Sequence, residues 1–269
     1  MKNKTRRLEI VRVSGAKANR QRDLVARESP VTILLNDVEL VTLLCSPSDL
    51  ENLAAGFLFG EGLINSRKEI KSIFADSKNG AVWVETKDGK KPQENLNAKR
   101  QVVTGCGKAF SFTNAALAKK TLKADSKFRM SASSVLPLMK DFQGRSEIYR
   151  KTGGVHSAGL ANLKGIIYFS EDIGRHNAID KVLGECLLKV VKTDRLVLVT
   201  SGRVSSDIVI KAGRSSIPII VSKSAPTDLA VALARELGIA IVGFVRGSRM
   251  NVYSNEWRLL TKPRRTTIQ

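Results

Sequence analysis

The second half of this 269-residue chain alternates short apolar runs with segments of helical periodicity. The apolar runs have the length and composition of buried strands and cover residues 166–169, 196–199, 217–221 and 239–245. The helical segments between them cover roughly residues 177–191, 205–212 and 226–237. Because the links are short, this alternation favours βαβ units around a mostly parallel sheet. The sequence therefore predicts an α/β domain here.

The first half has a different pattern, with partly alternating or apolar runs at 8–13, 31–35, 39–45 and 81–86. Asn36-Asp37 and Asp88-Gly89 supply turn chemistry, so we expect two hairpins. One helix is expected after residue 45, with Ser46 as its cap and its end at Gly60. We predict a smaller mixed α+β domain over residues 1–100, a linker or loop region over 101–130, and the α/β domain over 131–269.

Charge narrows the class of partner. Lys and Arg number 45 against 25 Asp and Glu, a formal net charge of +20. Such an excess favours a polyanionic partner: nucleic acid, a membrane surface or a phosphate-rich cofactor. A basic surface that only keeps the protein in solution is the alternative. Aromatic residues make up 5% of the chain, so interleaved stacking side chains for nucleic acid are scarce.

The chain has neither a signal-peptide pattern nor a membrane-spanning run. The charged N-terminus is followed by no long apolar stretch, and the apolar segment 53–63 is interrupted by Gly60, Glu61 and Gly62. Three cysteines, an odd and sparse number, fit a reducing compartment. We therefore expect a cytoplasmic protein without a membrane partner, and the lack of closely spaced cysteines predicts no metal site.

Cations follow the predicted strands of the second half. Ligands of open α/β sheets bind beyond the carboxyl ends of the strands, so these loops are the candidate site. The cations in question are Arg175, Arg203, Lys223, Arg246 and Arg249. Glycines beside three of the four loops allow close backbone approach, and Ser and N–H groups at helix starts can donate to phosphate. If the strands are neighbours, the loops form one anion site suited to a nucleotide or pyrophosphate, although each loop alone could be an ordinary basic turn.

The chain has two histidines, and each could have a functional or a structural role. His176 could act as a base or a phosphate donor, and its place near a helix start equally suits capping or packing. His156 follows Gly153-Gly154, where a structural hydrogen bond is the simpler interpretation.

Cys106 is the candidate nucleophile. Gly105 and Gly107 flank it, and Lys108 would favour its thiolate. A Gly-flanked thiolate can accept sulfur as a persulfide and present it elsewhere. Cys45 ends an apolar run and Cys186 lies on an apolar helical face, so we expect both in the core.

Several stretches taken together resemble the FdhD family of formate dehydrogenase accessory sulfurtransferases. They are residues 29–36, 44–50, 56–64, 104–107, 153–158, 171–180, 201–203 and 243–249, in this order over nearly the whole chain. The resemblance implies a cytidine-deaminase-like core in the second domain and a homodimer. It also implies a cysteine desulfurase as sulfur donor and formate dehydrogenase as the client.

The resemblance further implies that Cys106 carries the persulfide and that the sulfur acceptor is the bis(molybdopterin guanine dinucleotide) cofactor. The implied cofactor-binding segment consists of Phe244, Val245, Arg246, Gly247, Ser248 and Arg249. Its phosphates and guanine would suit the anion site predicted above, including Arg203, Lys223, Arg175 and His176.

Two departures from the family pattern limit the mechanism. Some members carry a Cys-x-x-Cys pair here, but this chain has Ala109 at the second position, which favours a single-cysteine relay. His176 is followed by Asn177 and Ala178, so the deaminase zinc set is missing and deamination is not expected. Two other functions stay open, a nucleic-acid-binding module and a non-catalytic chaperone that only docks the cofactor or the apo-enzyme.

Overall fold

The computed structural model describes residues 4–91, 102–103, 124 and 126–261, which form two compact units. Unit 1 holds the described residues within Met1–Asn114, Arg145–Gly159 and Tyr168–Lys192, and unit 2 those within Ala115–Gly144, Leu160–Ile167 and Thr193–Gln269. The units are discontinuous in sequence, whereas the predicted segments 1–100, 101–130 and 131–269 are continuous. That division into segments stays a prediction, and Cys106 lies outside the described residues.

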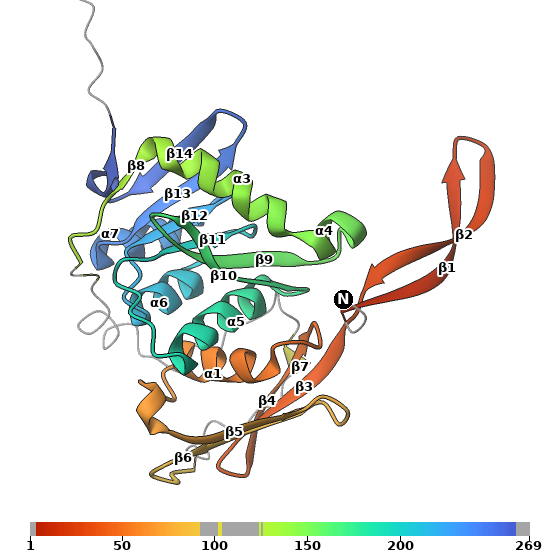
Figure 1. Ribbon diagram of the computed structural model, residues 1–269, viewed down its shortest axis with the longest axis horizontal. Helices are drawn as coiled ribbons and strands as arrows, with labels where there is room; N and C mark the ends of the chain where they lie inside the picture. Colours follow the sequence, from red (N-terminus) through yellow and green to blue (C-terminus); the bar gives the residue numbers. More distant parts are fainter. Residues whose placement is uncertain (1–3, 92–101, 104–123, 125, 262–269) are drawn as a thin grey trace, which may run out of the picture. The chain divides into compact units, whose positions relative to one another are not determined.

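Unit 1 contains a five-stranded sheet in the order β5-β6-β3-β4-β7 (Figure 1). Its strands are β3 (Ser29–Leu35), β4 (Val38–Cys45), β5 (Ile70–Asp76), β6 (Ala81–Thr86) and β7 (Val102–Val103). The β3–β4 hairpin is confirmed, and Asn36 and Asp37 adopt the left-handed backbone conformation that such a turn requires. The second predicted hairpin is wrong in its pairing, because β6 pairs antiparallel with the preceding β5 and parallel with β3.

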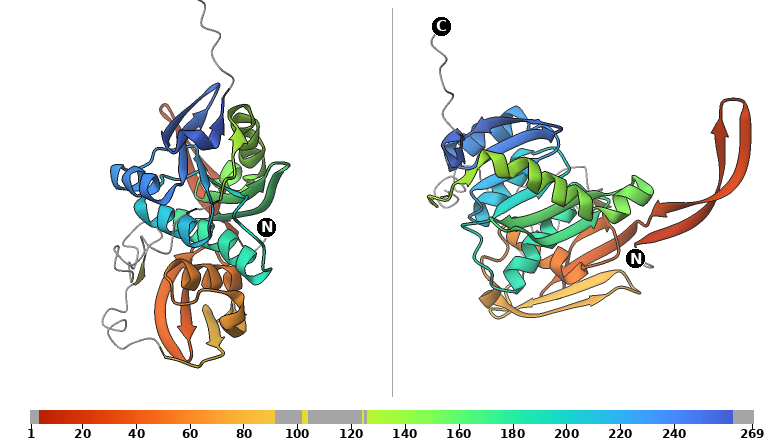
Figure 2. Two further views of the ribbon diagram at one scale, coloured as in Figure 1. Left: turned by 90° about the vertical axis from the view of Figure 1, so that its left-hand side faces the viewer. Right: turned by 45° about the horizontal axis from the view of Figure 1, so that its top comes forward.

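One face of this sheet packs on helix α1 (Leu50–Gly60), as Figure 2 shows. Alternate residues such as Val31 and Ile33 of β3 are buried against helix residues such as Leu53 and Leu58. No helix of the described residues packs on the opposite face, which keeps half-exposed side chains. The short 3-10 turn Arg67–Glu69 leads from the helix region into β5.

Helix α1 crosses helix α5 (Arg175–Leu188) at two glycines. A Cβ atom at Gly56 would lie 1.9 Å from the carbonyl oxygen of Asp180, and one at Gly184 would lie 1.9 Å from that of Asn52. No larger side chain fits there, so the two backbones approach each other directly. This contact is why both glycines stand in otherwise apolar helical runs.

The first two strands, β1 (Thr5–Ser14) and β2 (Lys17–Ala26), form a separate antiparallel hairpin in unit 1. The sequence predicted a strand only at 8–13, because the basic composition of 17–26 hides its extended conformation. No residue of either strand is buried. Unit 1 also holds helix α4 (Glu147–Thr152), whose first N–H groups, at Ile148 and Tyr149, donate to the buried carboxylate of Glu171.

Unit 2 is built on three parallel strands, β11 (Val197–Thr200), β12 (Ile219–Ser222) and β13 (Ala240–Arg246), with β14 (Arg249–Ser254) antiparallel to β13. They belong to a six-stranded sheet in the order β10-β9-β11-β12-β13-β14. Strands β9 (His156–Asn162) and β10 (Gly165–Asp172) each have residues in both units. The helices of unit 2 are α3 (Val135–Arg145), α6 (Ser206–Arg214) and α7 (Asp228–Leu237).

The predicted strands and helices of the second half are confirmed to within a few residues. All residues of β11 and β12 are buried, which explains why these strands read as continuous apolar runs without alternation. The structure is therefore a mixed α/β fold with several sheets. The cytidine-deaminase-like relationship of this core stays a prediction.

A buried arginine ties the chain ends of unit 2 together. Arg258 is only 1% exposed. Its guanidinium donates hydrogen bonds to the carbonyl oxygens of Ala124, Ser126, Phe128 and Gly238. Next to it, β15 (Leu259–Leu260) pairs parallel with β8 (Met130–Ser131), and the 3-10 turns Ala132–Ser134 and Glu256–Arg258 adjoin these strands.

Candidate functional site

The last residues of β11, β12 and β13 and the turns that follow them form what we call the platform, residues 200–205, 222–227 and 243–249. Because the strands are parallel neighbours, their carboxyl ends lie at the same edge of the sheet. The structure thus brings together three of the four predicted anion-binding loops. They carry Arg203, Lys223, Arg246 and Arg249, all of which are exposed.

Main-chain and hydroxyl contacts fix the platform loops to one another. The hydroxyl of Ser222 donates to the carbonyl of Gly202 over 2.7 Å, and the N–H of Lys223 donates to Thr200 over 3.2 Å. Further along, Val204 bridges Pro226. These bonds hold the backbone beneath Arg203 and Lys223, so the two cations start from fixed positions.

The third platform loop contains a strained residue. Phe244 has a φ of 52°, an uncommon conformation for an aromatic side chain, and its N–H donates to the carbonyl of Ser224 over 3.1 Å. A register shift between Gly243 and Arg246 accompanies it, and the Arg246 guanidinium lies 5.3 Å from the centre of the Phe244 ring. Such strain concentrates at binding sites.

The remaining predicted residues of this segment have different roles. Gly247, at φ 59°, and Ser248 form the turn between β13 and β14, and both are exposed. Val245 is fully buried, so only its backbone can face a ligand. Helix α6 starts beside this edge, and Ser205 at its N-cap makes no side-chain capping bond.

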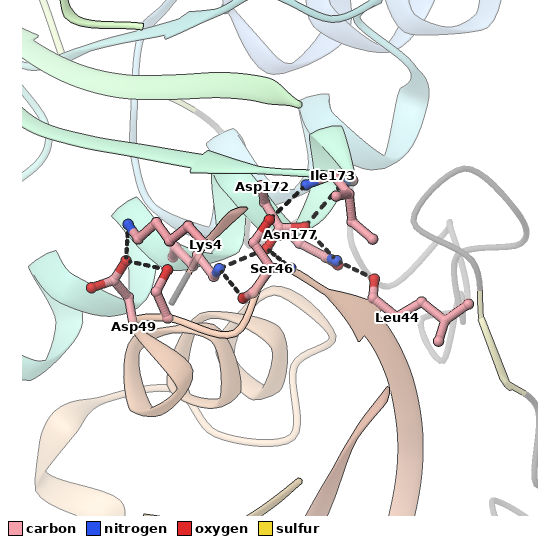
Figure 3. Close-up of polar contacts among 10 residues, drawn as sticks. Lys4, Leu44, Ser46, Asp49, Asp172, Ile173 and Asn177 are labelled. Carbon is pink, nitrogen blue, oxygen red and sulfur yellow. Dashed lines mark hydrogen bonds and ion pairs between the residues drawn. The ribbon is translucent and has the colours of Figure 1, made fainter. Parts of the chain in front are cut away.

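The fourth predicted loop follows β10 and belongs to unit 1. It carries Arg175 and His176 at the start of α5. Beneath them lies a fully buried polar cluster that we call the clamp, consisting of Ser46, Asp172, Asn177 and Lys181 (Figure 3).

Four donors satisfy the Asp172 carboxylate. Its Oδ2 accepts from Lys181 Nζ at 2.6 Å and from the Ser46 N–H at 3.0 Å, and its Oδ1 accepts from the Gly174 N–H at 2.9 Å and Asn177 Nδ2 at 3.0 Å. A buried charge with this many partners is stable where an unpaired one would not be.

The clamp joins two segments that are distant in sequence. Lys181 Nζ also donates to the Ser46 carbonyl at 2.9 Å, the Ile173 N–H donates to the Ser46 hydroxyl at 3.2 Å, and Asn177 Nδ2 donates to the Leu44 carbonyl at 2.9 Å (Figure 3). The end of β4 is therefore fastened to the turn from β10 into α5.

Ser46 does not cap α1, contrary to the sequence-based expectation. The N-cap residue is Asp49, in a left-handed conformation without a side-chain capping bond, and its carboxylate is paired with Lys4 at 3.3 Å. The tertiary partner of Ser46 replaces the local one. Sequence reasoning also missed Asp172 and Lys181, because neither stands out among the other charged residues between 171 and 185.

His156 lies at the start of β9, in the same unit as Arg175. Burial, and then the nearby Arg175 charge, lower the pKa of His156, while Asp172 opposes the shift. The imidazole is therefore neutral at pH 7. Its neutral form suits a hydrogen-bonding role next to the β10–α5 turn.

Two of the three thiols are confirmed as core residues. Cys45 is fully buried, and burial followed by the Asp172 charge raises the pKa of its thiol to about 12. Cys186 is 2% exposed, and burial raises the pKa of its thiol to about 12. Neither thiol forms a reactive thiolate near neutral pH.

Within the described residues, no cluster of three or more His, Cys, Asp or Glu could hold a metal ion. None of the helices in the described ranges is long and apolar enough to cross a membrane.

Comparisons with known proteins give one consistent result. The sequence pattern of the FdhD/NarQ family matches residues 26–260. Two curated relatives are called sulfur carrier protein FdhD. The one from Bacillus pumilus is 40% identical, over 88% of this chain and 90% of the relative. The one from Bacillus subtilis is 38% identical, over 93% of this chain and 96% of the relative.

A solved structure is also similar. It is described as a formate dehydrogenase accessory protein from Desulfotalea psychrophila, with a TM-score of 0.78 and 29% identity over 95% of this chain and 99% of that one.

Proposed function

The chain belongs to the FdhD/NarQ family, and on that premise we propose that it is a sulfur carrier serving formate dehydrogenase. In this proposal Cys106 receives a persulfide from a cysteine desulfurase. The sulfur then passes to the bis(molybdopterin guanine dinucleotide) cofactor. The names of the curated relatives and of the similar solved structure support the sulfur-carrying role and the link to formate dehydrogenase.

The observation that carries the proposal is the state of the other thiols. Cys45 and Cys186 are buried and their pKa values are raised to about 12, so neither can attack a donor at neutral pH. Of the three cysteines in the chain, Cys106 is left as the nucleophile.

Loading is a thiol exchange that balances without a further reagent. The Cys106 thiolate attacks the terminal sulfur of the donor persulfide, a new S–S bond forms at Cys106, and the donor sulfur–sulfur bond breaks. The donor cysteine leaves as a thiolate, and the terminal sulfur keeps its proton. Burial of the other two thiols prevents the loaded sulfur from forming an internal disulfide with them.

The platform of unit 2 supports binding of the cofactor end. Exposed Arg203, Lys223, Arg246 and Arg249 can neutralise phosphate, and the Phe244 ring offers a face near a guanidinium. Guanine and pyrophosphate are the parts of the acceptor that these groups would hold. Arg175 and His176, at the start of α5 in unit 1, stay predicted cofactor-binding residues.

The decisive experiment loads the full chain with cysteine and a cysteine desulfurase and weighs it by intact-mass spectrometry. We expect a gain of one sulfur atom, lost in Cys106→Ser and kept in Cys45→Ala and Cys186→Ala. A gain that survives Cys106→Ser would refute the assignment.

A second measurement separates sulfur transfer from simple docking. Formate dehydrogenase activity in cells carrying Cys106→Ser should be lost. Full activity with this variant would instead select the non-catalytic chaperone function.

A further inference from the structure

The turn between β5 and β6 contains Asn79-Gly80, the one Asn-Gly pair of the sequence. The main-chain nitrogen of the residue after an asparagine can attack the side-chain amide and close a cyclic imide. Glycine is the follower that hinders this attack least, because it has no Cβ and its backbone is the most adaptable. The pair lies outside both the platform and the clamp, and it is a candidate site of covalent modification.

The fold requires glycine at position 80. Gly80 has a φ of 64°, and a Cβ atom there would lie 2.6 Å from the carbonyl oxygen of Pro30. The Thr32 N–H donates to the Gly80 carbonyl over 2.8 Å, which fastens the turn to β3. A larger residue would disturb this contact with β3. The glycine that makes Asn79 reactive is therefore fixed by tertiary packing.

The exposed side chain of Asn79 is bonded to Asp76. Asn79 Nδ2 donates to Asp76 Oδ2 over 2.7 Å, and the Asn79 N–H donates to Asp76 Oδ1 over 3.1 Å. The Lys78 N–H donates to the same Oδ1 over 2.9 Å. The Asn79 N–H, and then the Asn79 side chain, lower the pKa of Asp76, so this acceptor is ionised at neutral pH.

We propose that Asn79 is a site of spontaneous deamidation, and that its side-chain bond to Asp76, which we call the latch, limits the rate. The latch holds the carboxamide on Asp76, so it must open before Cγ can turn toward the Gly80 nitrogen. An exposed hydrogen bond opens readily because water competes for both partners. The deamidation does not depend on the sulfur-transfer proposal.

The reaction needs no reagent except water. The Gly80 nitrogen gives up its proton and bonds to Asn79 Cγ. The bond from Cγ to Nδ2 breaks, and ammonia leaves with that proton. Water then opens the imide at either carbonyl. One opening gives aspartate at position 79, and the other gives an isoaspartyl linkage in which the main chain runs through the former side chain.

The product changes the turn. Position 79 loses its Nδ2 donor and gains a carboxylate next to the Asp76 carboxylate, and like charges this close repel each other. An isoaspartyl linkage also lengthens the main chain beside Gly80, whose carbonyl is bonded to Thr32. We therefore expect a looser β5–β6 turn and a more acidic form of the protein that ion-exchange chromatography separates.

The first test incubates the folded full chain at mildly alkaline pH and maps its peptides by mass spectrometry. We expect the mass gain of an amide NH2 replaced by OH at Asn79, with aspartyl and isoaspartyl peptides resolved by chromatography. Asn19 and Asn251 are internal controls, because both are exposed and neither precedes glycine. No gain at Asn79, or an equal gain at all three positions, would overturn the proposal.

The second test opens the latch. Asp76→Ala should raise the deamidation rate roughly two- to tenfold, the factor that corresponds to one net hydrogen bond. Glu51→Ala removes another exposed carboxylate, on α1, and should leave the rate unchanged. Circular dichroism checks that both variants are folded. An unchanged rate in Asp76→Ala would show that the latch has no control over the reaction.

A third variant measures the effect of the product without waiting for the reaction. Asn79→Asp places the second carboxylate beside Asp76 and should lower the melting temperature by roughly 1–3 °C. Asn19→Asp is the matched control at another exposed asparagine and should leave the melting temperature unchanged. Equal melting temperatures for Asn79→Asp and the unmodified chain would contradict the expected loosening of the turn.

Discussion

The clamp of unit 1 and the platform of unit 2 use charge in opposite ways. In the clamp, Lys181 and Asp172 are 1% and 0% exposed as side chains and are satisfied entirely by their own chain. On the platform, the cations are exposed and sit on a backbone fixed by hydrogen bonds. The first arrangement stabilises the protein, whereas the second leaves positive charge available to an anion. Charged residues near strand ends can therefore have either role, and burial decides which.

The largest expected difference between the two regions is in stability. Lys181→Met leaves the buried Asp172 carboxylate without its cation, which should lower the free energy of unfolding by about 3–5 kcal/mol. Lys223→Met removes an exposed platform cation and should change it by less than about 0.5 kcal/mol. Urea unfolding of both variants checks this contrast, and equal effects would contradict it.

The glycine contact gives a second, smaller contrast in stability. Gly56→Ala forces α1 away from α5 and should cost about 1–3 kcal/mol or more. Gly144→Ala is the matched control in helix α3, where an added Cβ would meet no atom within 4 Å, and it should be neutral or stabilising by up to about 1 kcal/mol. Thermal unfolding of the two variants measures both effects.

Substitutions on the platform should change ligand affinity rather than stability. Arg203→Ala should weaken GDP binding about tenfold, because a charge-assisted bond to phosphate is lost. Arg195→Ala removes another exposed cation, which precedes β11 at the opposite end of the strand, and should leave the affinity unchanged. Calorimetric titration with GDP tests this, and equal losses in the two variants would show that only overall charge matters.

The smallest effect concerns pH. The lowered pKa of His156 means that the unfolded chain binds a proton more readily than the folded one, so stability is present above pH 6.5 and is lost as pH falls below it. His156→Gln should reduce this acid dependence of the melting temperature between pH 8 and 5. An unchanged slope in the variant would mean that other groups cause it.

Local sequence patterns were sufficient to predict many of the strands and helices. Strands β11, β12 and β13 are confirmed because burial on both faces demands continuous apolar runs, and the β3–β4 turn is confirmed because Asn36-Asp37 tolerates left-handed backbone. The β2 strand was missed because a ribbon without a core has no hydrophobic alternation. Ser46 was misassigned because a capping pattern is local, while its real partner is 126 residues away.

The sequence by itself determined the strand–helix order of the second half, the family, and the burial of Cys45 and Cys186, since each follows from local composition or from motifs read in order. Only the tertiary structure decided that three cationic loops share one sheet edge and that Asp172 and Lys181 are enclosed with Ser46. These depend on which distant segments exclude water from one another, and no local pattern encodes that.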